Sequence, residues 1–154
     1  MLEITRRVLY NYIGKVRRGE KARMSKTAVK AVVKYKEKIL LLQKSEKELK
    51  NDGEKNRYDL PGGRVEENES PLCAALREIH EETGLISKDI TKIFEKAATK
   101  ANGEKITFIY YKCKADSDEV TLSCEHTGYI WKAKDEILND TCVPYWIKEV
   151  ISIT

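Results

Sequence analysis

The sequence contains few residues of the kinds that cross-link or interrupt a small domain. It has 3 prolines, 2 phenylalanines and 4 cysteines in 154 residues. The cysteines are scattered with no C-x-x-C pair, so buried or indifferent thiols in a reducing compartment are favoured over a metal or disulfide role. No apolar run approaches the length of a membrane span, and the N-terminus lacks the apolar core of a signal peptide. We therefore expect a cytoplasmic protein with no membrane partner.

Charge is abundant, and it is unevenly distributed. The chain is 41% hydrophobic and 35% charged, which together with its length favours one soluble domain. Residues 1–30 hold nine Lys and Arg against two Glu, a net charge of +7 in a chain whose total is +4. Residues 31–154 therefore carry −3. The basic character is confined to the start of the chain.

We expect residues 1–26 to form a basic N-terminal extension. Val8, Tyr12 and Val16 recur at helical spacing, so a short amphipathic helix is predicted. Such a helix would dock on the domain or on a second copy of the chain, as in a homodimer. Contact with RNA or polyphosphate is an alternative. The simplest interpretation is a solvated extension, because base-stacking aromatics beyond Tyr10 and Tyr12 are lacking.

Downstream of this extension the apolar pattern predicts a mixed sheet. Polar residues 45–57 contain Asp52-Gly53 and are interpreted as a surface loop. Asn102-Gly103 predicts a hairpin. The predicted elements are strands over 27–35, 39–42, 90–99, 106–115 and 129–131, a short helix over 135–138 and a terminal helix from Tyr145.

The most informative segment is a predicted helix in the middle of the chain. Ser70 is a suitable N-cap, Pro71 suits the first helical position, and Gly84 suits a left-handed C-terminal cap. An apolar stripe through Ala75 and Ile79 would face the core. Beside this stripe lies an acidic face.

Three carboxylates converge on that face. Glu78, Glu81 and Glu82 lie at i, i+3 and i+4, where like charges repel. Oxygen ligands of this kind suit Mg²⁺ or Mn²⁺, which polarise phosphoryl oxygens and lower the pKa of bound water. Arg77 would orient a carboxylate without competing as a ligand. A solvated acidic face is the alternative.

The spacing around these carboxylates fits the pattern G-x5-E-x7-R-E-U-x-E-E-x-G-U, where U is a bulky aliphatic residue. All nine specified positions match, which by chance is rarer than about one in 10⁷ in a chain of this length. This pattern is the Nudix box, and the sequence resembles the Nudix hydrolase (MutT-like) family. The matching residues are Gly63, Glu69, Arg77, Glu78, Ile79, Glu81, Glu82, Gly84 and Leu85.

The resemblance implies an α/β protein whose fold is a Nudix-type α/β/α sandwich with a mixed β-sheet, formed by residues 27–154. It implies Mg²⁺ as cofactor, with Mn²⁺ as a substitute, and it leaves open which carboxylate is the general base. The implied metal ligands are Glu78, Glu81, Glu82 and the backbone carbonyl of Gly63. Glu69 and Arg77 would brace them.

Two later residues are also candidates for the site. In many Nudix hydrolases a loop glutamate reaches the metal site, and Glu125 stands at a comparable spacing; an ordinary exposed acid is the alternative. His126 has a pKa suited to proton transfer, but a structural hydrogen-bonding role is favoured. His80 occupies a variable position of the box and is expected to face solvent.

The resemblance implies hydrolysis of a pyrophosphate bond in a nucleoside triphosphate or another nucleoside diphosphate-linked compound. Markers of three Nudix groups are missing: the proline of ADP-ribose pyrophosphatases, the tyrosine of diadenosine polyphosphate hydrolases, and the Ser-Gln-Pro of NADH-type enzymes. Nucleoside triphosphates are therefore the first choice of substrate. RNA 5′-end hydrolysis and a non-catalytic nucleotide sensor are the alternatives.

Overall fold

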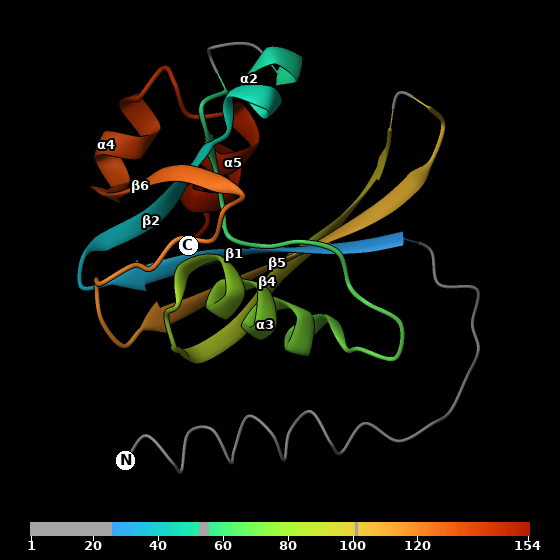
Figure 1. Cartoon of the computed structure of the whole chain (residues 1–154), viewed down its shortest axis with the longest axis horizontal. Helices are drawn as coiled ribbons and strands as arrows, with labels where there is room; N and C mark the ends of the chain where they lie inside the picture. The colour runs from blue at the N-terminus through green and yellow to red at the C-terminus, as the bar shows by residue number, and fades with distance from the viewer. Residues whose placement is uncertain (1–25, 53–55, 101) are drawn as a thin grey trace.

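The computed structural model describes residues 26–52, 56–100 and 102–154, which form one mixed sheet with helices on both faces (Figure 1). The strands are β1 (Lys26–Tyr35), β2 (Lys38–Lys44), β3 (Tyr58–Asp59), β4 (Ser87–Thr99), β5 (Lys105–Ala115) and β6 (His126–Ala133). The helices are α2 (Glu46–Asp52), α3 (Pro71–Thr83), α4 (Lys134–Asn139) and α5 (Tyr145–Ser152).

The strand order is β3-β2-β1-β5-β4, and β6 pairs with β2. β1 and β5 run parallel, whereas the other pairs are antiparallel. Leu42 of β2 pairs with Asp59 of β3 on one side and with Tyr129 of β6 on the other. The start of β6 therefore lies beside the end of β2, where Lys44 pairs with His126.

β1 and β2 pair only near their connecting turn, at Lys34↔Ile39 and Tyr35↔Lys38. Beyond that point, residues 61–65, which follow β3, run beside β1. Their backbone is held there by three hydrogen bonds, from the Val29 N–H to Gly63 O (2.8 Å), from Ala31 to Pro61 (2.8 Å) and from Val65 to Thr27 (2.9 Å). The glycine pair Gly62-Gly63, whose second member opens the box, is thereby held against the middle of β1.

Gly62 is required by this close approach. Its φ is +151°, and a Cβ at this position would lie 2.0 Å from the Val29 carbonyl oxygen. Any side chain would push the segment away from β1. Glycine therefore allows the backbone to reach the site described below.

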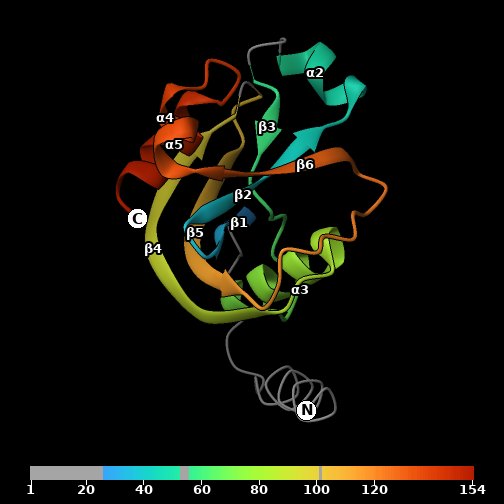
Figure 2. The ribbon, with the colours of Figure 1, turned by 90° about the vertical axis from the view of Figure 1, so that its left-hand side faces the viewer.

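Apolar side chains of the strands point alternately to the two faces of the sheet and form a hydrophobic core on each face. Figure 2 shows α3 on one face, with α4 and α5 on the opposite side. The core under α3 comprises Val29, Ala31, Val33, Leu40, Leu42, Ala74, Ala75, Ile79, Leu85, Ile109, Tyr111 and Cys113. The core under α4 and α5 comprises Val32, Ile39, Leu41, Leu60, Tyr110, Ile137, Val143, Ile147, Val150 and Ile151. The predicted α/β/α sandwich with a mixed sheet is confirmed.

One local prediction is wrong. The polar composition predicts a loop over residues 45–57, but Glu46–Asp52 form the helix α2. The Ser45 backbone N–H donates to Glu48 Oε2 (3.0 Å), and the Glu48 backbone N–H donates in return to the Ser45 hydroxyl (3.4 Å). This reciprocal start is a capping-box pattern, which the polar composition of the segment concealed.

The helical extension predicted over residues 1–26 lies outside the described residues, apart from Lys26. Among the helices of the described part of the chain, none is long and apolar enough to cross a membrane.

Candidate active site

α3 is held at both ends by the residues that the sequence predicted. The Ser70 hydroxyl accepts a hydrogen bond from the Cys73 N–H (3.1 Å), and Pro71 occupies the first turn. Gly84 closes the helix with φ +69°, and its N–H donates to the His80 carbonyl (2.8 Å). The orientation of the acidic face is therefore set by caps at both helix ends.

Arg77 is the centre of the ion-pair network on that face. Its Nε and Nη2 donate to the two oxygens of Glu69 (2.8 and 3.0 Å), and Nη1 donates to Glu78 (2.9 Å) and Glu81 (3.0 Å). Nη2 also bonds the Arg64 carbonyl (3.1 Å). One guanidinium thus positions three carboxylates and the segment that follows the glycine pair.

These contacts move two carboxyl pKa values in opposite directions. Burial would raise the pKa of Glu69, but hydrogen bonds from Arg77 and from the Glu66 N–H, with the charge of Arg77, hold it below the usual value. Burial raises the pKa of Glu78, and Arg77 offsets this only in part because Glu82 and Glu81 repel its charge. The surroundings therefore favour the ionised form of Glu69 and disfavour the ionised form of Glu78.

The Glu78 carboxylate also lies close to the glycine pair. A Cβ at Gly63 would lie 2.3 Å from Glu78 Oε1, so the box glycine leaves room for this carboxylate. The Gly63 carbonyl accepts the hydrogen bond from Val29 described above. One of its two lone pairs is thus engaged within the fold.

Glu82 has a different environment, with a side chain only 7% exposed. Its Oε2 accepts a hydrogen bond from the Gly62 N–H (2.8 Å), and its Oε1 lies 3.0 Å from His126 Nε2. Burial would lower the pKa of His126, but the hydrogen bond and charge of Glu82 raise it overall. Both oxygens of Glu82 are therefore held by the protein itself.

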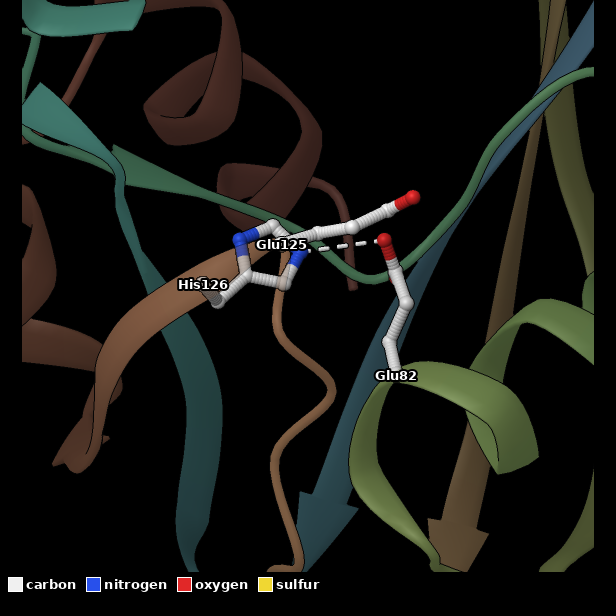
Figure 3. Close-up of side chains that lie close together, drawn as sticks. All are labelled: Glu82, Glu125 and His126. Carbon is white, nitrogen blue, oxygen red and sulfur yellow. Dashed lines mark hydrogen bonds and ion pairs between the residues drawn. The ribbon is translucent and has the colours of Figure 1, made fainter. Parts of the chain in front are cut away.

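Glu125 and His126 stand together where the loop after β5 enters β6. Figure 3 shows the Glu125 carboxylate and the His126 ring converging on Glu82. One ligand atom from each residue lies within 4.8 Å of the others. Among the described residues, no hydrogen-bond donor contacts the Glu125 carboxylate, so it is available to water or to a cation.

Two adjoining cavities, each of about 440 Å³, meet at Gly62, Glu82 and Glu125. The first is lined by Gly62, Gly63, Arg64, Arg77, Glu78, Glu81, Glu82, Ser123, Cys124 and Glu125. The second is lined by Lys30, Ser45, Glu48, Asp59, Gly62, Glu82, Glu125 and His126. Together they make a polar groove with carboxylates at its centre.

Apart from Glu69, which lies behind Arg77, the predicted site residues line this groove, and the carboxylates form two groups. Arg77 holds Glu69, Glu78 and Glu81, while Glu82 and Glu125 lie with His126. His80 is exposed, as predicted.

Sequence reasoning missed Gly62; for His126 it favoured a structural hydrogen bond, which the structure shows, but it did not identify Glu82 as the partner. The Gly-Gly pair before the box was a signal for the first, and the adjacency to Glu125 was a signal for the second. The Lys30–Asp59 ion pair (2.7 Å) in the second cavity was also missed, because it joins residues from different strands.

Comparison with known families is consistent with this geometry. The family model for the NUDIX domain matches residues 24–151, so the chain belongs to the Nudix family. The family membership predicted from the Nudix box is confirmed.

Two curated relatives match part of the chain. The asymmetrical bis(5′-nucleosyl)-tetraphosphatase of Sus scrofa is 43% identical over 81 residues, which is 49% of this chain and 55% of that protein. An RNA pyrophosphohydrolase of Bartonella tribocorum is 34% identical over 77 residues, which is 50% of this chain and 38% of that protein. The chain thus spans about half of the first relative and less of the second.

A solved structure covers more of the chain. The MutT protein from Methanosarcina mazei has a TM-score of 0.63 and 28% identity, over 82% of this chain and 90% of that one. The similarity therefore extends over most of the sheet and its flanking helices, well beyond the box.

Proposed function

We propose that this protein hydrolyses a pyrophosphate bond in a nucleoside triphosphate or another nucleoside diphosphate-linked compound, with Mg²⁺ as cofactor and Mn²⁺ as a substitute. The observation that carries the proposal is the groove in which Glu78, Glu81, Glu82 and Glu125 gather around the box helix. Membership of the Nudix family supports it. The alternative of a solvated acidic face does not explain why Glu82 is buried or why Arg77 is hydrogen-bonded to Glu78 and Glu81.

The donor set fits divalent cations. The lining offers several carboxylates, and burial together with neighbouring charge makes ionised Glu78 unfavourable without a counter-charge beyond Arg77. Hard cations prefer carboxylate and carbonyl oxygens. We assign Glu78, Glu81, Glu82 and the Gly63 carbonyl as ligands, with Glu69 and Arg77 as their braces.

When bound, divalent cations would offset phosphate charge and lower the pKa of a nucleophilic water. The protein residues then orient the reactants. Arg77 keeps Glu78 and Glu81 at one wall, and the Gly62 N–H keeps Glu82 at the centre. Glu125 accepts the proton of the attacking water, because its carboxylate is exposed and carries no donor from the described residues. The new phosphorus–oxygen bond forms as the bond to the bridging oxygen breaks, giving two phosphate products.

Two other substrate classes have specific support. The pig relative is named a bis(5′-nucleosyl)-tetraphosphatase, which favours dinucleoside polyphosphates despite the missing tyrosine marker. The Bartonella relative is named an RNA pyrophosphohydrolase, and this chain has a basic N-terminal segment. A non-catalytic nucleotide sensor is the remaining alternative, and the intact box argues against it.

A substrate screen tests the proposal. Purified protein is incubated with nucleoside triphosphates, dinucleoside tetraphosphates and 5′-triphosphorylated RNA, each with Mg²⁺ or Mn²⁺, and both products are identified by mass. We expect one class to be cleaved at a phosphoric anhydride bond. Binding of nucleotides without any cleavage would replace the enzyme with the sensor.

Deletion of residues 1–24 separates the RNA alternative from the others. If the basic segment binds RNA, deletion weakens RNA affinity and flattens its salt dependence. If it only docks or stays solvated, hydrolysis of small nucleotides is unchanged. A cytoplasmic location and a homodimer through this segment belong to the same proposal, and sedimentation of the full and shortened chains tests the dimer.

A further inference from the structure

His126 is placed as a ligand would be, although the box does not include it. Its side chain is 6% exposed, and its Nε2 lies 3.0 Å from Glu82 Oε1. Figure 3 shows that this nitrogen faces the two carboxylates, whereas the other ring nitrogen lies on the far side of the ring. The metal ligands that the family resemblance implies are all oxygen atoms, but here an imidazole nitrogen lies beside one of them, on Glu82.

The spacing between these atoms suits coordination of a single ion. Two ligands about 2.1 Å from one ion in octahedral geometry are about 3.0 Å apart. The Nε2–Oε1 separation has this value, and an oxygen of Glu125 lies within 4.8 Å of both atoms. A cation at the common centre would replace the proton that now bridges Glu82 and His126, with little movement of either side chain.

We propose that Glu82, Glu125 and His126 form a mixed nitrogen–oxygen cation position, which prefers first-row transition ions such as Ni²⁺, Co²⁺ and Zn²⁺ over Mg²⁺. The proposal rests on the proposed function in that Glu82 and Glu125 belong to both sites. Imidazole suits these ions, whereas Mg²⁺ favours oxygen ligands. Two carboxylates and a neutral imidazole carry a charge of −2, which matches a divalent ion.

The position is distinct from the carboxylates held by Arg77. Glu78 and Glu81 each accept a hydrogen bond from that guanidinium, whereas Glu82 accepts from Gly62 through Oε2 and keeps Oε1 toward His126. Lys30, which lines the adjoining cavity, is bonded to Asp59 (2.7 Å) and to the Leu60 carbonyl (3.2 Å). Its ammonium group is thereby directed to these partners.

Nitrogen NMR on the unmodified full chain provides the first test. The sequence has two histidines, so the imidazole nitrogens give few signals. We expect Zn²⁺ to move the Nε2 resonance of His126 strongly and to leave exposed His80 unaffected, while Mg²⁺ moves neither strongly. Equal responses of both rings, or no Zn²⁺ response at His126, would overturn the proposal.

Calorimetry with Ni²⁺ and Mg²⁺ provides the second test. His126→Gln keeps an N–H for Glu82 but removes the imidazole, and His80→Gln is the matched control on an exposed ring. We expect His126→Gln to weaken Ni²⁺ binding by about tenfold or more and Mg²⁺ binding by less than about threefold. Unchanged Ni²⁺ affinity in His126→Gln rejects the proposal.

The affinity readout does not depend on turnover. If the protein cleaves no nucleotide but loses Ni²⁺ affinity in His126→Gln, the proposed function fails and the cation position stands. If it cleaves nucleotides with Mg²⁺ and keeps full Ni²⁺ affinity in His126→Gln, the reverse holds.

Discussion

Arg77 and Glu69 form a two-point ion pair, with Nε and Nη2 each donating to one carboxylate oxygen at 2.8 and 3.0 Å. Glu69 precedes α3 and Arg77 lies in its second turn. The pair therefore ties the entry of the helix to its acidic face. The third guanidinium nitrogen, Nη1, remains available for Glu78 and Glu81.

Arg77→Lys should lower turnover by roughly 10²-fold, because a lysine ammonium cannot reproduce the planar fork and serves fewer acceptors. The melting temperature should also fall, since Glu69 and Glu78 lose hydrogen bonds. Arg57→Lys is the control and should be nearly silent, because Arg57 is exposed and its hydrogen bonds to Cys142 and Lys44 are made by the backbone. Full activity in Arg77→Lys would show that the network is dispensable.

Glu82→Gln should lower turnover by roughly 10²–10⁴-fold, the range for a positioned acid–base or ligand group. Repulsion among three carboxylates alone predicts that stability rises or stays level. The structure reverses that expectation, because the Glu82 carboxylate accepts a hydrogen bond from the Gly62 N–H and faces His126. We therefore expect Glu82→Gln to lower the free energy of unfolding by about 1–2 kcal/mol.

Glu67→Gln is the matched control for this substitution. Glu67 lies in the variable part of the box and is exposed. Turnover and denaturant unfolding of both variants check the prediction. Near-wild-type turnover of Glu82→Gln at saturating Mg²⁺ would reject the site.

Gly84→Val should destabilise the protein and reduce its activity. A β-branched residue at φ +69° costs about 1–2 kcal/mol, and its Cβ would lie 3.2 Å from Thr121 Cβ. Thr121 and Ser123 donate backbone hydrogen bonds to Thr83 and Glu82, so this contact reaches the loop that carries Glu125.

Gly103→Val separates backbone strain from that contact. Gly103 has φ +80°, and a Cβ there meets nothing within 4 Å. It should lose stability but keep activity, as judged by melting temperature and turnover. Equal loss of activity in both variants would contradict the link between Gly84 and the Glu125 loop.

Asp140→Asn should make the free energy of unfolding vary less with pH in the acidic range. The hydrogen bond from Lys132 lowers the pKa of Asp140, against the opposing effect of burial, and the Cys142 N–H lowers it further. A lowered folded-state pKa stabilises the fold above the unfolded pKa, and this stabilisation is lost as pH falls through the folded pKa.

We therefore expect Asp140→Asn to cost about 1 kcal/mol at pH 7 and less at pH 3, which lies below the ordinary pKa of an aspartate. Urea unfolding at both pH values checks this, with exposed Asp118→Asn as the control. A cost that does not change with pH would mean that the Asp140 charge is not responsible.

Cys124 should be the first cysteine to react with iodoacetamide. It is exposed and lines the first cavity, whereas Cys73 and Cys113 are buried. Burial raises the pKa of Cys113 to about 12, which suppresses its thiolate.

The adduct on Cys124 should occupy part of the groove and lower turnover. Peptide mass mapping identifies the modified residue, and Cys124→Ser should be resistant to inhibition. Inhibition that persists in Cys124→Ser would place the sensitive thiol elsewhere.

Local signals were sufficient for the helix and much of the sheet. Ser70, Pro71 and Gly84 act on their own backbone neighbours, so their roles follow from residue type and spacing. The failure at residues 45–57 is also local: the Ser45–Glu48 capping pair was present, but the lack of an apolar face hid the helix.

The sequence by itself determined the family, the type of site and the box carboxylates, because these depend on spacing within one helix. Tertiary structure alone decided that Glu82 meets His126, 44 residues away, and that Gly62 donates to the same carboxylate. These contacts arise where β1 and β2 separate, the glycine segment lies beside β1, and β6 starts next to the end of β2. Strand pairing between distant segments sets that arrangement, and spacing along the chain does not encode it.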